Sequence, residues 1–278
     1  MARAEYHYTL ALVGVMLVII LPTLVMTILF PLRYHHSRKA TYRPDWHFSL
    51  AIEILAWGVP LVIVTVLCFL TVSGVYALDP WGPGALAKAD AATSEPAINV
   101  QVIATDWQWV FIYPDEKIAT IDELVVPAGR RVNLKMTATS NMDGFYIPAV
   151  APMVDAMPAM QTQDAFIIDN PGHFTGFSTD FSGAGFSWME FSTRSVSNAD
   201  YASWVKNIQA TGAPLDYATF DKTIAPAKVN YGAKPSYYTL TDPGLFGQVI
   251  SAAMMGKTYP VSDALTESVD TGAAPASP

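Results

Sequence analysis

The chain has 278 residues, of which 51% are hydrophobic and only 14% are charged. This composition is too apolar for an ordinary soluble domain, and it indicates membrane segments joined to a folded globular part. The residues after Leu78 hold 11 basic and 21 acidic side chains. A globular part with this acidic balance argues against nucleic acid as a partner.

Side chains that bind transition metals are scarce. The one cysteine, Cys68, lies in an apolar run, and four of the five histidines precede residue 48. The last 200 residues therefore hold one histidine, His173, and no cysteine. A dinuclear copper centre needs two thiolates and two imidazoles, so this part of the chain cannot supply its ligands.

Two uncharged apolar runs predict a transmembrane hairpin over residues 1–78. The first run, Thr9–Phe30, has 22 residues and is long enough to cross a hydrocarbon core of about 30 Å as a helix kinked at Pro22. The second run is Ile54–Leu78. A cleaved signal peptide is the alternative for the first run, but the run is longer than the apolar part of such peptides.

The segment between the runs, residues 31–47, carries four basic residues and one acidic residue. Lysine and arginine collect in loops that stay in the cytoplasm. We therefore expect a cytoplasmic hairpin at 31–47, with the N-terminus and the C-terminal domain in the periplasm. His35 and His36 are expected to belong to this solvated loop and not to a metal site.

Glu53 opens the second apolar run, at its cytoplasmic edge. Its position alone supports two interpretations equally. One is an interfacial carboxylate near a helix N-terminus, where the helix dipole favours negative charge. The other is a point where protons enter, because ionisable groups at membrane depth are costly and tend to be functional.

A globular all-β domain is predicted over residues 97–196, after a Pro-, Gly- and Ala-rich linker at residues 79–96. Apolar residues alternate from Ile98 to Ala104, and an aromatic stretch follows. We expect Trp107 and Trp109 to share one face of a strand and to serve as packing groups.

Short strands continue to about residue 196. Residues 118–140 are expected to form two strands, broken at Pro127–Gly129. Short strands with turn residues at regular intervals favour a β-sandwich or barrel.

The last third of the chain differs in pattern. Residues 197–265 are expected to hold an amphipathic helix at Asn198–Gly212 and an aromatic-rich segment at Tyr231–Ile250 that docks on a larger complex. Residues 266–278 are small and polar, and we expect them to be disordered.

The stretch FSTDFSGAGFSWMEF, Phe177–Phe191, has the spacing of a copper-binding loop without its main ligands. It resembles the Cys-x3-Cys-x3-His-x2-Met loop of the dinuclear copper (CuA) centre in cytochrome c oxidase subunit II. Ser178 and Ser182 stand at the cysteine positions and Phe186 at the histidine position, whereas Met189 is kept. A serine hydroxyl is a poor ligand for copper, which prefers thiolate, thioether and imidazole groups.

Other positions complete this degenerate site. Asp143 stands where the copper-bearing relatives have a further histidine ligand, and Asp180 lies between the two serines. The degenerate CuA positions are therefore Asp143, Ser178, Asp180, Ser182, Phe186 and Met189. Met142, Met153, Met157 and Met160 are expected to fill the core and not to bind Cu(I), and His173 is expected to be a turn residue.

These features together resemble subunit II of a cytochrome bo-type ubiquinol oxidase of the haem-copper oxidase superfamily. They are the two spans with a basic hairpin, the segment Glu53-x3-Trp57-x2-Pro60, the WQW strand, the FSGAGFSWM loop and the aromatic-rich tail. The resemblance implies a membrane-anchored all-β fold. A two-helix transmembrane hairpin would precede a cupredoxin-like β-sandwich lacking CuA and a short helical, aromatic-rich C-terminal tail.

The resemblance also implies a function in the bacterial inner membrane. Subunit I would carry two haems and a copper (CuB), oxidise ubiquinol, reduce oxygen to water and pump protons. The present chain would hold no cofactor, would contact subunits I, III and IV and membrane lipid, and would need no cytochrome c. Glu53 would lie at the mouth of a proton channel, the K channel, in subunit I.

Two other functions are alternatives to this one. A cytochrome c oxidase subunit would need a copper relay, which the ligand count excludes. A stand-alone membrane-tethered cupredoxin-like protein, for binding or assembly, would need methionines or histidines clustered on an exposed face.

Overall fold

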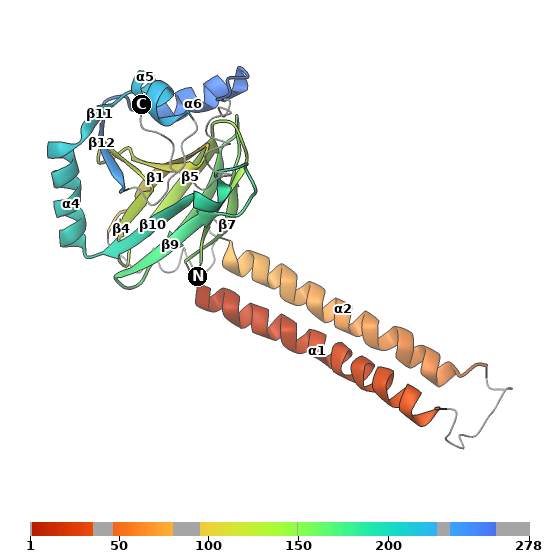
Figure 1. Ribbon diagram of the computed structural model, residues 1–278. Helices are drawn as coiled ribbons and strands as arrows, with labels where there is room; N and C mark the ends of the chain where they lie inside the picture. Colours follow the sequence, from red (N-terminus) through yellow and green to blue (C-terminus); the bar gives the residue numbers. More distant parts are fainter. Residues whose placement is uncertain (1, 36–46, 80–94, 149, 227–233, 260–278) are drawn as a thin grey trace. The chain divides into compact units, whose positions relative to one another are not determined.

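The computed structural model of the protein describes residues 2–35, 47–79, 95–148, 150–226 and 234–259. The chain divides into two compact units, a helical hairpin within Ala2–Ala85 and a β-rich domain within Leu86–Pro278 (Figure 1). Most of the predicted linker, residues 80–94, and the whole of the predicted disordered tail lie outside the described residues.

The hairpin consists of α1 (Ala2–Arg33) and α2 (Leu50–Leu78). Both helices are long and apolar enough to cross a membrane, and almost none of their side chains is buried within the chain itself. The two helices pack against each other, and Gly74 of α2 leaves room for the ring of Tyr8 of α1. The unburied apolar faces are those expected of helices surrounded by lipid or by other subunits.

The domain contains two sheets. In spatial order, the first consists of β11 (Ala213–Leu215), β12 (Ser236–Leu240), β3 (Ile118–Ile121), β2 (Gln108–Tyr113), β1 (Ile98–Thr105), β5 (Arg131–Ala138) and β8 (Thr162–Ile167). The second consists of β4 (Glu123–Pro127), β10 (Glu190–Val196), β9 (Gly172–Ser178), β6 (Asp143–Ile147) and β7 (Ala151–Ala156). Strands β1 and β5, β4 and β10, and β11 and β12 pair in parallel, and the other pairs are antiparallel. This architecture confirms the predicted β-sandwich.

Strand β2 is buried on both faces. Trp109, Phe111 and Tyr113 point into the core between the sheets, whereas Val110 and Ile112 belong to a second core. The second core contains Leu215, Phe220, Ile224, Leu240, Leu245 and Phe246 from the C-terminal segments. Because side chains alternate along a strand, the outer face of the first sheet must be covered, and the C-terminal segments cover it.

The segment that follows β1 differs from the prediction. Residues 98–113 form a hairpin of β1 and β2, and Trp107 lies in its turn with φ of 79°. Trp107 and Trp109 therefore do not share a strand face, although both are buried as packing groups.

A second difference occurs at Asp122, where φ is 58°. This residue separates β3 from β4, so residues 118–140 hold three strands and not two. Its carboxylate Oδ1 accepts a hydrogen bond from the backbone N–H of Trp109 at 2.8 Å, and its own N–H donates to Trp109 O at 2.8 Å. Asp122 thus fixes the point where the chain passes from the first sheet to the second.

The predicted helix after the sandwich is confirmed as α4 (Asn198–Thr211). Ser197 caps it, because its hydroxyl accepts a hydrogen bond from the N–H of Asp200. Next come β11, α5 (Tyr217–Thr219), the π-helical turn η2 (Phe220–Ile224), β12 and α6 (Leu245–Met254). In Figure 1, α4 lies along one side of the domain, and α5 and α6 lie together at one end.

The described part of the aromatic-rich segment packs on its own domain. Strand β12 pairs with β3, and Phe246 of α6 is buried in the second core. The expectation that this segment docks on other subunits stays a prediction, since Tyr237 is partly exposed. Phe246 is buried over the outer face of the first sheet, whereas Tyr238 is half-buried and Tyr237 is exposed.

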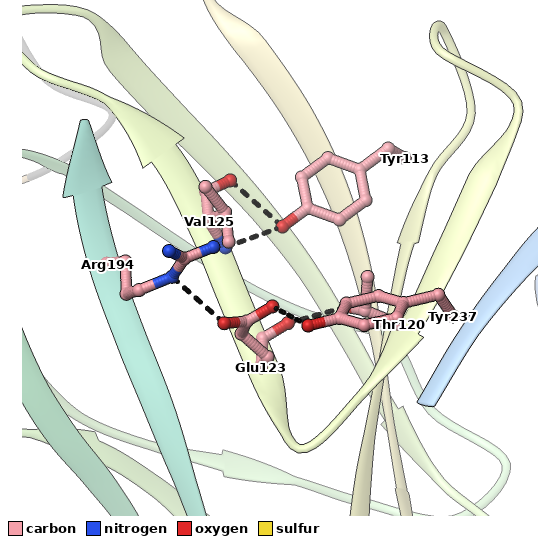
Figure 2. A network of polar contacts seen from close by, with 6 residues as sticks. All are labelled: Tyr113, Thr120, Glu123, Val125, Arg194 and Tyr237. Atoms are coloured by element: carbon pink, nitrogen blue, oxygen red, sulfur yellow. Dashed lines mark hydrogen bonds and ion pairs between the residues drawn. The ribbon is translucent and has the colours of Figure 1, made fainter. Parts of the chain in front are cut away.

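A buried carboxylate ties the C-terminal strand to the sandwich (Figure 2). Glu123 of β4 is buried, and its Oε2 accepts a hydrogen bond of 2.8 Å from the hydroxyl of Tyr237 in β12. Its Oε1 lies 2.9 Å from Nε of Arg194 in β10, an ion pair whose direction falls short of a hydrogen bond. Burial raises the pKa of Tyr237 to about 12, and the hydrogen bond to Glu123 adds to the shift.

Two hydroxyls complete the network drawn in Figure 2. The hydroxyl of Thr120 donates to the main-chain carbonyl of Glu123. The hydroxyl of Tyr113 accepts a hydrogen bond from the N–H of Val125 at 2.9 Å and donates to its carbonyl at 3.0 Å. The network therefore joins β2, β3, β4, β10 and β12, which belong to both sheets.

Tyr237→Phe should lower the free energy of unfolding by about 1–3 kcal/mol, because it removes a hydrogen-bond donor from a buried carboxylate. Urea unfolding of the detergent-solubilised chain, followed by tryptophan fluorescence, measures the change. Tyr238→Phe is the matched control, since the hydroxyl of Tyr238 makes no hydrogen bond to the described residues. Equal effects of the two substitutions would contradict the proposed role of the Tyr237 hydroxyl.

Candidate functional site

The degenerate loop connects β9 to β10 and carries a short 3₁₀ helix, η1 (Phe186–Trp188). At its base the N–H of Ser178 donates to Met189 O at 3.2 Å. Ser178 also meets the start of β6, where its hydroxyl donates to Asp143 Oδ1 at 3.2 Å. The structure therefore brings together three of the predicted positions, Asp143, Ser178 and Met189, from three segments of the chain.

The side chain of Trp107 packs against the loop and holds it by a hydrogen bond. Its indole N–H donates to Ser182 O at 3.2 Å. The loop passes so close to the ring that a Cβ at Gly185 would overlap the indole, so this position requires glycine. The loop is thus held by hydrogen bonds to its main-chain carbonyls and by packing against the indole ring, neither of which needs a metal ion.

A recess of about 340 Å³ lies beside the loop. It is lined by Phe177, Ser178, Thr179, Phe186, Ser187, Met189 and Glu190. Three of the six predicted positions, Ser178, Phe186 and Met189, share this wall. Met189 is 1% exposed, and the ring of Phe186 lies 5.7 Å from that of Phe181.

The pKa values of two carboxyl groups at the site, Asp143 and Asp180, are raised. Burial raises the pKa of Asp143 to about 7, an effect that the hydroxyls of Ser182 and Ser178 partly oppose and the charges of Asp106 and Asp180 increase. The pKa of Asp180 is also raised, by burial and by Asp155.

These donors do not fit a dinuclear copper centre. Carboxylates and hydroxyls are hard ligands, whereas copper prefers thiolate, thioether and imidazole groups, of which only the thioether of Met189 stands at a predicted position. Among the residues that the structure describes, no three His, Cys, Asp or Glu side chains are grouped to hold a metal ion.

Several predicted side chains lie elsewhere than expected. Met142, Met153 and Met160 are exposed, so the prediction that they fill the core is wrong for these three. His173 lies within β9, opposite Arg194 of β10, and not in a turn.

Sequence reasoning missed the two acids Asp106 and Asp155, which act on Asp143 and Asp180. Asp106 directly precedes the WQW motif, in the turn between β1 and β2. Its place between two strongly apolar strands could have indicated from the sequence that Asp106 belongs to the site. Asp155 lies on β7 and gave no comparable signal.

Glu53 lies on α2, one turn after the helix begins. A recess of about 160 Å³ at this end of the helix is lined by His47, Phe48, Ser49, Ile52 and Glu53. The carboxylate is exposed within the chain. An imidazole, a hydroxyl and a carboxylate therefore border one small recess.

Comparisons with known proteins identify the family of the chain. A family model described as cytochrome c oxidase subunit II, periplasmic domain, matches residues 116–196. The ubiquinol oxidase subunit 2 of Acetobacter aceti is 35% identical over 237 residues, which cover 85% of this chain and 74% of that protein. The cytochrome bo(3) ubiquinol oxidase subunits 2 of Pseudomonas aeruginosa and of Buchnera aphidicola subsp. Baizongia pistaciae are 33% and 37% identical. Each of these alignments covers 85% of this chain, and they cover 69% and 80% of the respective relatives. The chain therefore belongs to the ubiquinol oxidase subunit 2 family of the haem-copper oxidases.

Proposed function

We propose that this chain is the copper-free subunit II of a proton-pumping ubiquinol oxidase in a bacterial inner membrane. The observation that carries the proposal is the ligand set of the degenerate loop. Asp143, Ser178, Ser182 and Phe186 stand at the histidine and cysteine positions, and the 200 residues after Leu78 hold one histidine and no cysteine. A loop that is folded but lacks its copper ligands fits an oxidase whose electron donor does not need a copper relay.

Ubiquinol is such a donor, because it dissolves in the membrane and can reach a haem directly. Subunit I would hold two haems and CuB and would carry out the reduction of oxygen to water. The present chain would anchor and cap subunit I, with subunits III and IV and membrane lipid as further neighbours. No electron transfer step is assigned to any residue of this chain.

The proposed topology follows from charge. The basic segment 31–47 would face the cytoplasm, and the N-terminus and the domain would face the periplasm. Residues 1–78 would form the anchor, 79–96 the linker, 97–196 the sandwich and 197–265 its C-terminal cover. Glu53 would then lie at the cytoplasmic edge of α2, where we propose that it admits protons to the K channel of subunit I.

One observation favours a second function. Three methionines, Met142, Met153 and Met160, are exposed on the domain. Exposed thioethers suit Cu(I), as expected of a stand-alone tethered protein that binds copper or assists assembly. Such a protein would not copurify with haem-containing subunits.

The electron donor is the first test. The complex purified through this chain should consume oxygen with reduced ubiquinol and should show no uptake above background with reduced cytochrome c. An oxygen electrode measures both rates on the same preparation. Uptake with cytochrome c would contradict the proposal, and the absence of any copurifying haem protein would favour the second function.

Glu53→Gln should slow ubiquinol oxidation severalfold, because a neutral amide cannot pass on protons. Haem content and subunit composition should not change, and optical spectra and gels measure both. The control is Glu5→Gln, which removes a carboxylate from the N-terminal part of α1. Wild-type turnover in the Glu53→Gln complex would remove this residue from the proton pathway.

The loop should regain copper when its ligands are restored. The chain that carries Asp143→His, Ser178→Cys, Ser182→Cys and Phe186→His should bind copper and become coloured, because Met189 and the supporting Trp107 remain in place. Absorption spectra and copper analysis measure the result. The same chain with Ser178 and Ser182 unchanged is the control, and failure of the fourfold variant to bind copper would contradict an inherited loop geometry.

A further inference from the structure

Four aspartates gather at the degenerate loop from four parts of the fold. Asp106 lies in the turn between β1 and β2, Asp143 begins β6, Asp155 lies on β7, and Asp180 lies in the loop itself. Asp143 is 1% exposed and Asp106 is 2% exposed. The charged groups that act on Asp143 are Asp106 and Asp180, and both are acidic. No cation balances the carboxylates among the groups that act on Asp143.

Hydrogen-bond donors are also too few for these oxygens. Asp143 Oδ1 accepts from the hydroxyl of Ser178, and Asp106 Oδ1 accepts from Nδ2 of Asn141 at 2.9 Å. Asp106 Oδ2 and Asp180 Oδ2 are buried and make no hydrogen bond to a described residue. The hydroxyl of Ser182 lies close to Asp143 without a well-formed hydrogen bond.

A buried anion without a partner is costly, and binding a proton removes this cost. The proton neutralises the charge and also supplies a donor to a neighbouring oxygen. A cation would do the same, but no three of these acids are placed as ligands in the described chain. The arrangement therefore suits a proton better than a metal ion.

We propose that the pocket at the degenerate loop is a proton-binding site, in which Asp143 holds a proton while the loop is closed and loosens the loop when it ionises. The raised pKa values of Asp143, Asp106 and Asp180 agree with this geometry. The inference concerns the loop and its acids, and it holds whichever electron donor the oxidase uses.

The loop is coupled to Asp143 through its base. Ser178 donates its hydroxyl to Asp143, and the N–H of the next residue, Thr179, donates to Gly144 O at 2.9 Å. A negative charge on Asp143 repels Asp180 in the loop and Asp106 in the turn below it. Ionisation strengthens the hydrogen bond from Ser178, but the cost of burying the charge and its repulsion from Asp106 and Asp180 outweigh this gain and destabilise the closed loop.

The direction of the pH dependence follows from linkage. The closed state binds the proton more tightly than an open, solvated state, in which an aspartate has a pKa of about 3.9. Closure is therefore strongest at low pH and is lost as the pH rises towards about 7, the pKa of Asp143 in the closed state. The open fraction should grow by up to about tenfold per pH unit over that range and should then level off.

Oxidation of methionine by hydrogen peroxide can measure this opening in the purified complex. The sulfur of Met189 is buried under the closed loop, whereas Met142 and Met153 are exposed and serve as internal standards for the reagent. Met136, which is fully buried in the sandwich core, reports any global unfolding. Mass spectrometry follows the oxidation of each methionine in the same sample.

We expect the oxidation rate of Met189, relative to Met142, to rise by at least about tenfold between pH 5 and pH 8, while Met136 stays protected. In Asp143→Asn the amide keeps an acceptor for Ser178 and carries no charge, so the Met189 rate should depend much less on pH, with only Asp106 and Asp180 left to titrate. Asp169→Asn, which removes an exposed carboxylate elsewhere in the domain, should behave as the unsubstituted chain. A Met189 rate that is independent of pH in the unsubstituted chain would overturn the proposal, and so would an unchanged pH profile in Asp143→Asn.

Asp106→Asn provides a second variant if Asp143→Asn fails to fold, which oxidation of Met136 would reveal. Loss of the Asp106 charge lowers the cost of ionising Asp143, so the Met189 rate should level off at a lower pH. If the plateau does not shift, the result would contradict the proposal that Asp106 and Asp143 act as one acid cluster. The oxygen-uptake rates with ubiquinol and cytochrome c, measured on the same preparation, test the proposed function separately.

Discussion

The burial of β2 on both faces is the constraint on which the rest of the domain depends. Trp109, Phe111 and Tyr113 fill the space between the sheets, and Val110 and Ile112 turn the opposite way. A strand of this kind cannot leave one face in water without exposing apolar side chains. The chain after residue 197 resolves this by adding β11 and β12 to the first sheet and by placing α5, η2 and α6 over its outer face. The C-terminal segments are therefore a structural part of the sandwich domain, and not an appendage to it.

The degenerate loop keeps its shape through contacts that involve no metal ion. Its shape rests on the Ser178–Met189 backbone hydrogen bond, on the bond from Trp107 to Ser182 O and on the close approach of Gly185 to the indole ring. None of these contacts involves a side chain that would bind copper. The shape of the loop therefore does not depend on the side chains at the predicted degenerate positions Ser182 and Phe186.

The sequence predicted those features that depend on local pattern. Apolar length identified both long helices and alternation identified β1, whereas the resemblance to a copper-binding loop placed Asp143 with Ser178. The predictions from sequence failed where contacts between residues far apart in the chain determine the local conformation. Trp107 adopts a turn conformation because β1 folds back on β2, and Asp122 breaks a strand because it bonds to the backbone of Trp109. The packing of Phe246 against the outer face of β2 was not predicted, because β2 was not recognisable as buried on both sides. Asp106 and Asp155 joined the site only through tertiary contacts.

The pairing of β12 with β3 has a consequence for the way the domain is made. More than a hundred residues separate these neighbouring strands. Strands β4 and β10 also pair, although β5 to β9 lie between them in the sequence. Pairings of such long sequence separation form late, after most of the chain is available. During synthesis Val110 and Ile112 must remain uncovered until β12 and α6 have left the ribosome. The time between the arrival of β2 and that of α6 is therefore the period in which the emerging domain is most open to aggregation.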